Sequence, residues 1–226
     1  MTRWRRIAQA LAQVALATLL AACASHPPAP RWQGNAGAAI DRAIAAYLDG
    51  DTRVADAEFD RARAEVARTG RPDLLARVEL TRCAVRVASL VFERCEGFER
   101  LRPDAGAAER AYADYLAARV VPQDVALLPP QHRAVAAAGA NVDAAIGAVG
   151  SIEDPLSRLV AIGVLFQSGR ASPSAIALAV DTASSQGWRR PLVAWLNVQV
   201  ELAERAGDAD EALRLRRRIG VALGSG

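Results

Sequence analysis

The stretch "GDTRVADAEFDRA" (residues 50–62) returns in altered form as "GDADEALRLRRRI" (residues 207–219). Aligned on their Gly-Asp pairs, the two stretches place Ala55 opposite Ala212, and apolar or small residues recur at helical spacing in both. Glycine opens the turn between two helices, and small residues let one helix seat against the next. Because a single helical hairpin cannot bury its apolar face, this recurrence predicts a stack of hairpins.

The same periodicity continues through most of the chain, and the alternation typical of strands is almost absent. Asp154-Pro155 and Ser172-Pro173 each place a capping side chain before a proline that suits the first helical position. Asp208 begins a further predicted helix. An all-α fold is therefore predicted. We expect helices near residues 36–49, 52–69, 73–92, 104–118, 131–149, 155–168, 173–186, 191–206 and 208–222.

Two of the predicted helix pairs resemble the tetratricopeptide repeat. The matching small, aromatic or leucine positions are Ala43, Ala46, Gly50, Ala55, Phe59 and Ala62 in the first pair, and Leu196, Ala203, Gly207 and Ala212 in the last. Arg216 stands where the repeat has an aromatic residue, and no proline closes either pair at the usual place. The resemblance implies a TPR-like α-solenoid with an extended concave surface that binds protein or peptide.

The first residues have the pattern of an export signal. Arg3, Arg5 and Arg6 precede an uncharged run (residues 7–22) that would span about 24 Å as a helix, less than the roughly 30 Å of a bilayer core. The run ends in "LAAC" (residues 20–23), which resembles the lipobox of bacterial lipoproteins. An ordinary secreted protein or a short uncleaved anchor are the alternatives.

The lipobox resemblance implies a lipid-modified Cys23. In that family the thiol carries a diacylglycerol, the peptide is cut just before the cysteine, and the new amino terminus is acylated, as with palmitate. Ala24 and Ser25 follow in place of the Asp that often retains lipoproteins in the inner membrane, which favours the outer membrane. The Pro-rich stretch "SHPPAPRWQG" (residues 25–34) is expected to be a non-helical tether.

These features divide the chain into five parts. We expect a signal peptide (residues 1–22), a lipidated tether (23–35), N-terminal helical repeats with a disulfide (36–119), a connector (120–132) and C-terminal helical repeats (133–226). The connector is expected to be non-helical at its Pro-Pro pair, and either to be a long connection or to divide the array into two lobes.

The charge balance argues against nucleic-acid binding. The chain has 28 basic and 25 acidic residues, and three of the arginines lie in residues 1–22, which hold no acid. The predicted mature chain is therefore formally neutral, whereas a nucleic-acid partner calls for a basic excess or stripe.

Cys83 and Cys95 are the cysteines of the predicted mature body. In the oxidising compartment beyond the inner membrane, such a pair favours a disulfide worth roughly 3 kcal/mol by the chain-entropy estimate. A metal pair or a redox-active dithiol are the alternatives, but the spacing is not C-x-x-C and no histidine lies near in sequence.

Catalytic signals are sparse. The chain has two histidines, His26 in the tether and His132 after the Pro-Pro pair, and no G-x-S-x-G, H-E-x-x-H or Gly-rich phosphate loop. The sequence therefore indicates no cofactor, no metal site and no small-molecule substrate. His132 is expected on the surface or in the first turn of a helix. An enzyme acting on the envelope or cell wall would need His132 beside a carboxylate or serine.

Three stretches are candidates for partner binding. Trp188, Arg189 and Arg190 begin a helix and are of the residue types that dominate interface hot spots, although Trp188 could instead staple the turn. "RLRRR" (residues 214–218) is either a solvated helix end or a contact for anionic lipid. "LVFERCEGF" (residues 90–98) is either a docking surface or a small satellite core.

The sequence thus predicts an outer-membrane lipoprotein that faces the periplasm and acts as a protein-binding helical scaffold, as in envelope assembly or secretion. The alternatives are the envelope enzyme that uses His132 and a structural lipoprotein without a client.

Overall fold

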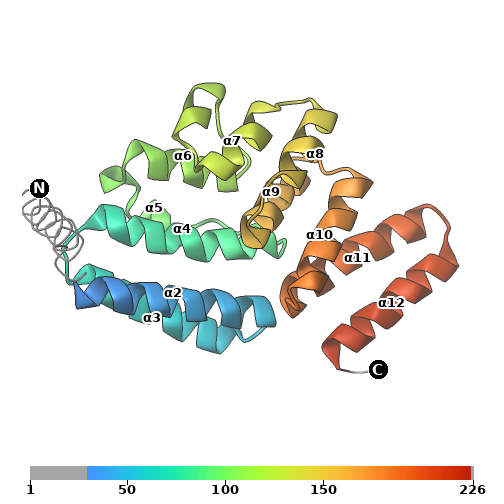
Figure 1. Cartoon of the computed structure of the whole chain (residues 1–226), viewed down its shortest axis with the longest axis horizontal. Helices are drawn as coiled ribbons and strands as arrows, with labels where there is room; N and C mark the ends of the chain where they lie inside the picture. The colour runs from blue at the N-terminus through green and yellow to red at the C-terminus, as the bar shows by residue number, and fades with distance from the viewer. Residues whose placement is uncertain (1–29, 225–226) are drawn as a thin grey trace, which may run out of the picture.

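The computed structural model of the protein describes residues 30–224 (Figure 1). All regular secondary structure within this range is helical, and the range contains no strand, which confirms the all-α prediction. The predicted signal peptide (residues 1–22), the candidate lipidation site Cys23 and His26 lie outside the described residues.

Three antiparallel helices form the N-terminal part of the body: α2 (Arg31–Asp49), α3 (Thr52–Ala67) and α4 (Pro72–Ala88). Alanines let these helices approach closely, since Ala43, Ala55 and Ala62 are fully buried. Leu48 and Phe59 fill the space between the helices and belong to the same apolar cluster.

Helix α2 begins earlier than the sequence predicted. Residues 31–34, which we expected to be non-helical, form its first turn, because Pro30 takes the N-cap position and the next residues are compatible with a helix. Trp32 also packs against the N-terminal apolar cluster, and this contact stabilises the first turn of the helix.

Shorter elements follow α4. They are α5 (Glu96–Glu99), the 3-10 helix η2 (Arg102–Asp104), α6 (Ala107–Leu116), the 3-10 helix η3 (Pro122–Leu127), α7 (Pro130–Ala137) and α8 (Val142–Gly150). The predicted connector thus contains η3 and the start of α7. Our expectation that the Pro-Pro pair is non-helical is wrong for Pro130, which occupies the first helical position that proline tolerates, while Pro129 is the N-cap.

The helix predicted over residues 131–149 is two helices. Gly139 adopts a left-handed conformation (φ 53°) and ends the first, and the side chain of Asn141 caps the second by accepting a hydrogen bond from the Ala144 N–H (3.0 Å). Apolar periodicity continues across this break, and for that reason the sequence pattern suggested one helix.

The C-terminal part comprises α9 (Pro155–Gln167), α10 (Pro173–Ser185), α11 (Arg189–Arg205) and α12 (Ala209–Leu223), each packed against the next. The predicted caps are confirmed: Asp154, Ser172 and Asp208 each accept a hydrogen bond from a backbone N–H in the first turn of their helix.

The two parts join where α9 packs against α4. Gly163 of α9 faces α4 so closely that a Cβ atom there would lie 2.4 Å from the carbonyl oxygen of Val87. In space, α9 therefore follows α4 in the stack, and residues 89–154 form an insertion that covers these two helices (Figure 1). One large apolar cluster runs from α4 through the insertion to α12.

Candidate functional site

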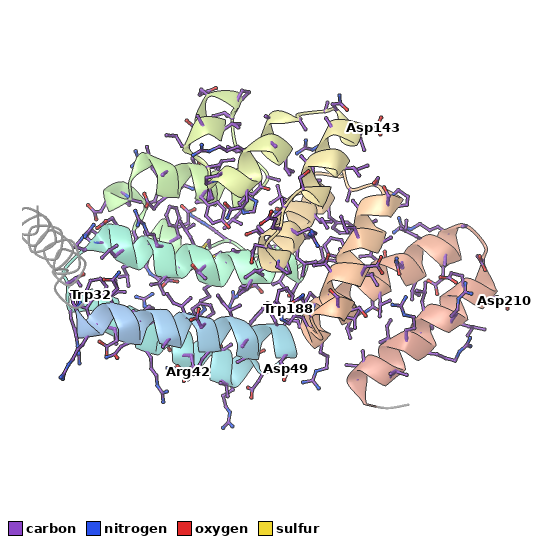
Figure 2. The ribbon with its side chains drawn as sticks, viewed as in Figure 1. Trp32, Arg42, Asp49, Asp143, Trp188 and Asp210 are labelled. Carbon is purple, nitrogen blue, oxygen red and sulfur yellow. A yellow bond between two sulfur atoms is a disulfide. The ribbon has the colours of Figure 1, made fainter. Side chains whose placement is uncertain are left out.

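Trp188, Arg189 and Arg190, the predicted partner-binding residues, lie against the end of α2 (Figure 2). The guanidinium of Arg189 donates to the carbonyl oxygen of Asp49 from Nε (2.9 Å) and Nη2 (2.6 Å). Arg190 donates to the Tyr47 carbonyl (2.6 Å), and its guanidinium lies 4.2 Å from the centre of the Tyr47 ring. Cations are favoured at the C-terminus of a helix, where carbonyl groups lack helical partners.

These residues therefore join α11 to α2 within the chain. Trp188 is partly buried and packs against both apolar clusters. Trp195 is fully buried and donates its indole N–H to the Ala88 carbonyl (3.1 Å). The structure thus places the three candidate side chains at a junction between two helices of the same chain, and the two arginines already have hydrogen-bond partners.

The second predicted feature, the pair Cys83 and Cys95, forms a disulfide that links α4 to the start of α5 (Cα–Cα 5.9 Å). The apolar stretch around Cys95 does not form a satellite core of its own: Phe98 is buried in the large apolar cluster, whereas Phe92 lies 36% exposed.

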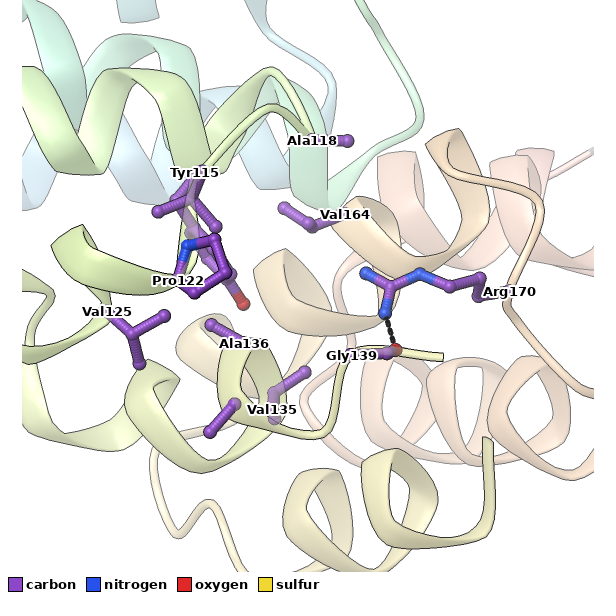
Figure 3. A pocket seen from close by; sticks show the side chains of 11 residues that line it. Tyr115, Ala118, Pro122, Val125, Val135, Ala136, Gly139, Val164 and Arg170 are labelled. Carbon is purple, nitrogen blue, oxygen red and sulfur yellow. Dashed lines mark hydrogen bonds between the residues drawn. The ribbon is translucent and has the colours of Figure 1, made fainter. Parts of the chain in front are cut away.

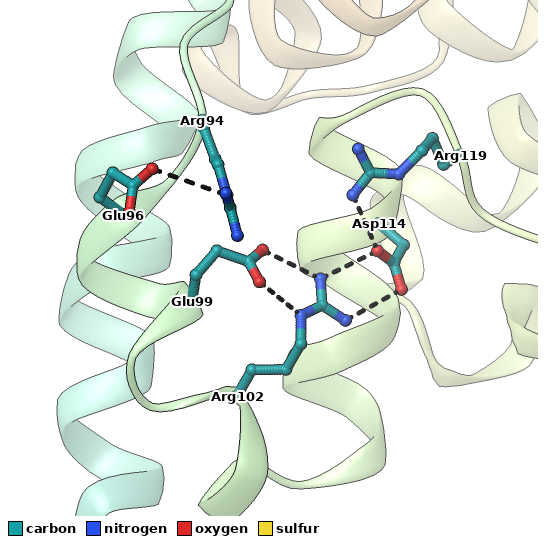
Figure 4. A network of polar contacts seen from close by, with 6 residues as sticks. All are labelled: Arg94, Glu96, Glu99, Arg102, Asp114 and Arg119. Atoms are coloured by element: carbon teal, nitrogen blue, oxygen red, sulfur yellow. Dashed lines mark hydrogen bonds and ion pairs between the residues drawn. The ribbon is translucent and has the colours of Figure 1, made fainter.

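An ion-pair network continues from this disulfide towards α6 (Figure 4). Arg102 bridges Glu99 (3.0 Å) and Asp114 (3.0 Å), and Asp114 also accepts from Arg119 (3.3 Å). Partial burial would raise the pKa of Asp114, but the hydrogen bonds and charges of the two arginines outweigh it and hold this pKa below its usual value. The network is a structural brace, since each of its charges has a partner of opposite sign.

His132 lies in the first turn of α7, as one of our expectations had it, but it is buried, so its expected surface position is wrong. Its Nδ1 lies 3.3 Å from the Tyr115 hydroxyl, and its ring stacks on that of Tyr112. Burial lowers the pKa of His132 to about 4 and raises that of Tyr115. The hydrogen bond found for its side chain goes to a tyrosine, not to the carboxylate or serine that the envelope-enzyme alternative needs.

A pocket of about 460 Å³ lies beside this aromatic group, between the end of α6, η3, α7 and the end of α9 (Figure 3). Most of its lining is apolar, including Val125, Val135 and Val164. The lining residues with polar side chains are Tyr115 and Arg170. A pocket of this size and composition matches the sites that take small ligands.

A shallower groove lies along α12. It has a volume of about 400 Å³, an apolar floor made by α11 and α12, and a cationic rim. Its lining residues are Ser184, Leu192, Leu196, Arg214, Arg217, Arg218, Val221 and Ala222. None of these is acidic, and Arg217 and Arg218 make no ion pair with any residue from 30 to 224.

The sequence predicted neither the pocket nor the groove as a site. The arginines of "RLRRR" were visible as a cluster, but the apolar floor beside them depends on how α11 and α12 pack. Arg170 and Tyr115 are far apart in sequence and belong to no motif, so no local sequence signal could have shown that they line the same pocket.

Within residues 30–224, no three histidine, cysteine or acidic side chains gather as metal ligands would, and no helix combines the length and apolarity needed to cross a bilayer. No model of a known protein family, no curated protein and no solved structure matches this chain significantly.

Proposed function

We propose that the chain is a lipoprotein of the bacterial outer membrane whose helical body faces the periplasm and binds a protein partner. Support for the anchor comes from the lipobox resemblance at Cys23 and from the basic, apolar and uncharged runs before it. The link between Cys23 and α2, residues 24–30, spans at most about 25 Å when extended. The body would therefore be held close to the membrane surface.

The body has features of a degenerate TPR-like stack. The small residues that matched the repeat pattern pack between helices, as Ala43, Ala55 and Ala212 are almost fully buried. In this reading α2 to α4 and α9 to α12 are the stacked helices, and the insertion lies between two of them. Stacks of this kind bind partners through preformed surfaces.

The single observation that carries a binding role is the exposed apolar and cationic face of α12. Val221, which lines the groove, is 73% exposed, and Leu213, about two turns earlier on α12, is 51% exposed. An exposed apolar surface with a polar rim marks an interaction site. We assign the binding surface to the α12 groove and not to Trp188, Arg189 and Arg190, because the two arginines are already hydrogen-bonded to α2.

The charge of the groove indicates the partner. Arg217 and Arg218 are exposed on its rim without a carboxylate partner among the described residues, so a segment that combines apolar and acidic side chains would complement it. In Figure 1, α12 lies beyond the end of α2 and away from the start of α2, to which the tether is joined in sequence. This position favours a protein segment in the periplasm over the lipid headgroups of the anchoring membrane.

Site-specific crosslinking in cells tests the binding role. A photocrosslinker at Ser184, an exposed residue of the groove lining, should capture a defined neighbour, through an acidic segment of that neighbour, from cells that express the full chain. Val221→Asp combined with Arg217→Glu should abolish this capture. The matched control is Val54→Asp combined with Arg53→Glu on α3, where an exposed valine and an exposed arginine also stand side by side. Unchanged capture by the groove variant, or capture of lipid alone, would rule out the proposed partner.

A separate experiment tests the anchor. Globomycin, which blocks the lipoprotein signal peptidase, should cause a larger, lipid-bearing precursor to accumulate. Cys23→Ser should prevent lipid labelling and release the chain from the outer-membrane fraction. If the Cys23→Ser chain fractionates as the unchanged chain does, the anchor is wrong, whatever the outcome for the groove.

A further inference from the structure

The pocket between α6, η3, α7 and α9 is separate from the α12 groove and plays no part in the proposed function. It encloses about 460 Å³, which is more than the packing voids of a core and within the range of small-ligand sites. Two of its lining residues, Ala118 and Gly139, have left-handed backbones (φ 55° and 53°) where α6 and α7 end. The walls are therefore built from helix ends that leave room between them.

Arg170 gives this pocket a fixed positive charge. Its Nε donates to the Ser168 hydroxyl (3.0 Å), and its Nη1 donates to the Gly139 carbonyl, so the guanidinium is held in place (Figure 3). No carboxylate between residues 30 and 224 pairs with it. Both protons of Nη2 and one of Nη1 remain for another acceptor, which is the arrangement that binds a carboxylate through two oxygens.

The remainder of the lining favours an apolar ligand body. Val125, Val135, Ala136 and Val164 present hydrocarbon from three different elements. Tyr115 adds one hydroxyl, 3.3 Å from His132 Nδ1, that can form one further hydrogen bond towards the pocket. An apolar pocket with one fixed cation selects its ligand through a single charged contact and through its shape.

We propose that this pocket binds a small, mostly apolar molecule that carries one carboxylate, as a medium-chain fatty acid does. Arg170 holds the carboxylate at the mouth, and the hydrocarbon part lies against Val135, Ala136 and Val164. Removing water from these apolar walls and from the ligand supplies the affinity, and the guanidinium supplies the selectivity for an acid over the matching alcohol.

Photolabelling with a chosen probe tests the proposal. Decanoic acid bearing a diazirine and an alkyne is added to the cell fraction that holds the full-length chain, and labelled peptides are identified after irradiation. We expect labels within residues 118–139 that unlabelled decanoate displaces. Arg170→Gln should raise the decanoate concentration needed for half displacement about tenfold or more, the effect of losing a charged hydrogen bond, and leave that for decanol unchanged.

The controls separate a lost site from a lost fold. Arg133→Gln removes a comparable arginine that donates to the Leu128 carbonyl outside this pocket, and it should leave displacement unchanged. Ala136→Phe should fill the chamber and abolish labelling; circular dichroism establishes that each variant is folded. If Ala136→Phe does not fold, Arg170→Gln alone decides. The proposal would be overturned if decanoate and decanol displaced the probe equally well, both from the unchanged protein and from Arg170→Gln. Labels found only outside the pocket would also overturn it.

Discussion

Gly163→Ala should destabilise the protein, although alanine is normally the better helix residue. Replacing a helical glycine by alanine gains about 1 kcal/mol from propensity. At this position, however, the new methyl group would lie 2.4 Å from the Val87 carbonyl oxygen and 3.0 Å from the Val87 Cγ1, whereas ordinary contacts begin at 3.4 Å. A backbone oxygen cannot rotate away, so α9 and α4 must separate, and overpacking of this kind costs about 1–3 kcal/mol. With the cost at the upper end, the net loss is about 2 kcal/mol.

Urea unfolding followed by circular dichroism measures this loss. With a slope of about 2 kcal/mol per molar urea, the midpoint should fall by about 1 M. Gly147→Ala is the matched control, because Gly147 lies within α8 and its Cβ would meet nothing within 4 Å. The control should gain about 0.5–1 kcal/mol. If Gly163→Ala stabilises the protein as much as Gly147→Ala does, the close approach of α4 and α9 is refuted, and with it the stacking order across the insertion.

Three further changes test other parts of the structure. Reducing the Cys83–Cys95 disulfide should lower the free energy of unfolding by about 3 kcal/mol, measured by urea titration with and without a phosphine reductant, and Cys83→Ser should make the two titrations coincide. Arg190→Ala should cost about 1–3 kcal/mol and speed amide exchange in the last turn of α2, because it removes two hydrogen bonds and a cation–ring contact; exchange that stays unchanged would contradict the junction. Since burial lowers the pKa of His132 to about 4 from an ordinary 6.5, the unfolded chain binds the extra proton first as the pH falls. The stability contributed by this residue is therefore complete above pH 6.5 and declines by up to about 3 kcal/mol towards pH 4, and His132→Phe should flatten that part of the stability profile.

Helix positions were largely predictable because their signals are local. A capping side chain before a proline, as at Asp154 and Ser172, satisfies backbone groups within four residues, so no distant part of the chain needs to be known. The break at Gly139 was missed because apolar spacing continues on both sides of it. The start of α2 was missed because the effect of Pro30 was extended to residues beyond it, where proline places no restriction.

The sites were less predictable because they depend on contacts between distant residues. Arg189 and Arg190 had the composition of an interface, and the interface that the structure shows is one within the chain. His132 follows a proline pair, a context typical of surface turns, yet Tyr112 and Tyr115 of another helix cover it. In each case the residue type indicated that a contact would form, and only the packing of helices determines with which partner.

The junction between α2 and α11 also bears on how the molecule is made. Asp49 and Arg189 are 140 positions apart. In the exported chain that we propose, the amino end emerges first, so α2 and α3 emerge well before the arginines that complete the hydrogen bonding of α2. The first hairpin to form is therefore among the last to be completed.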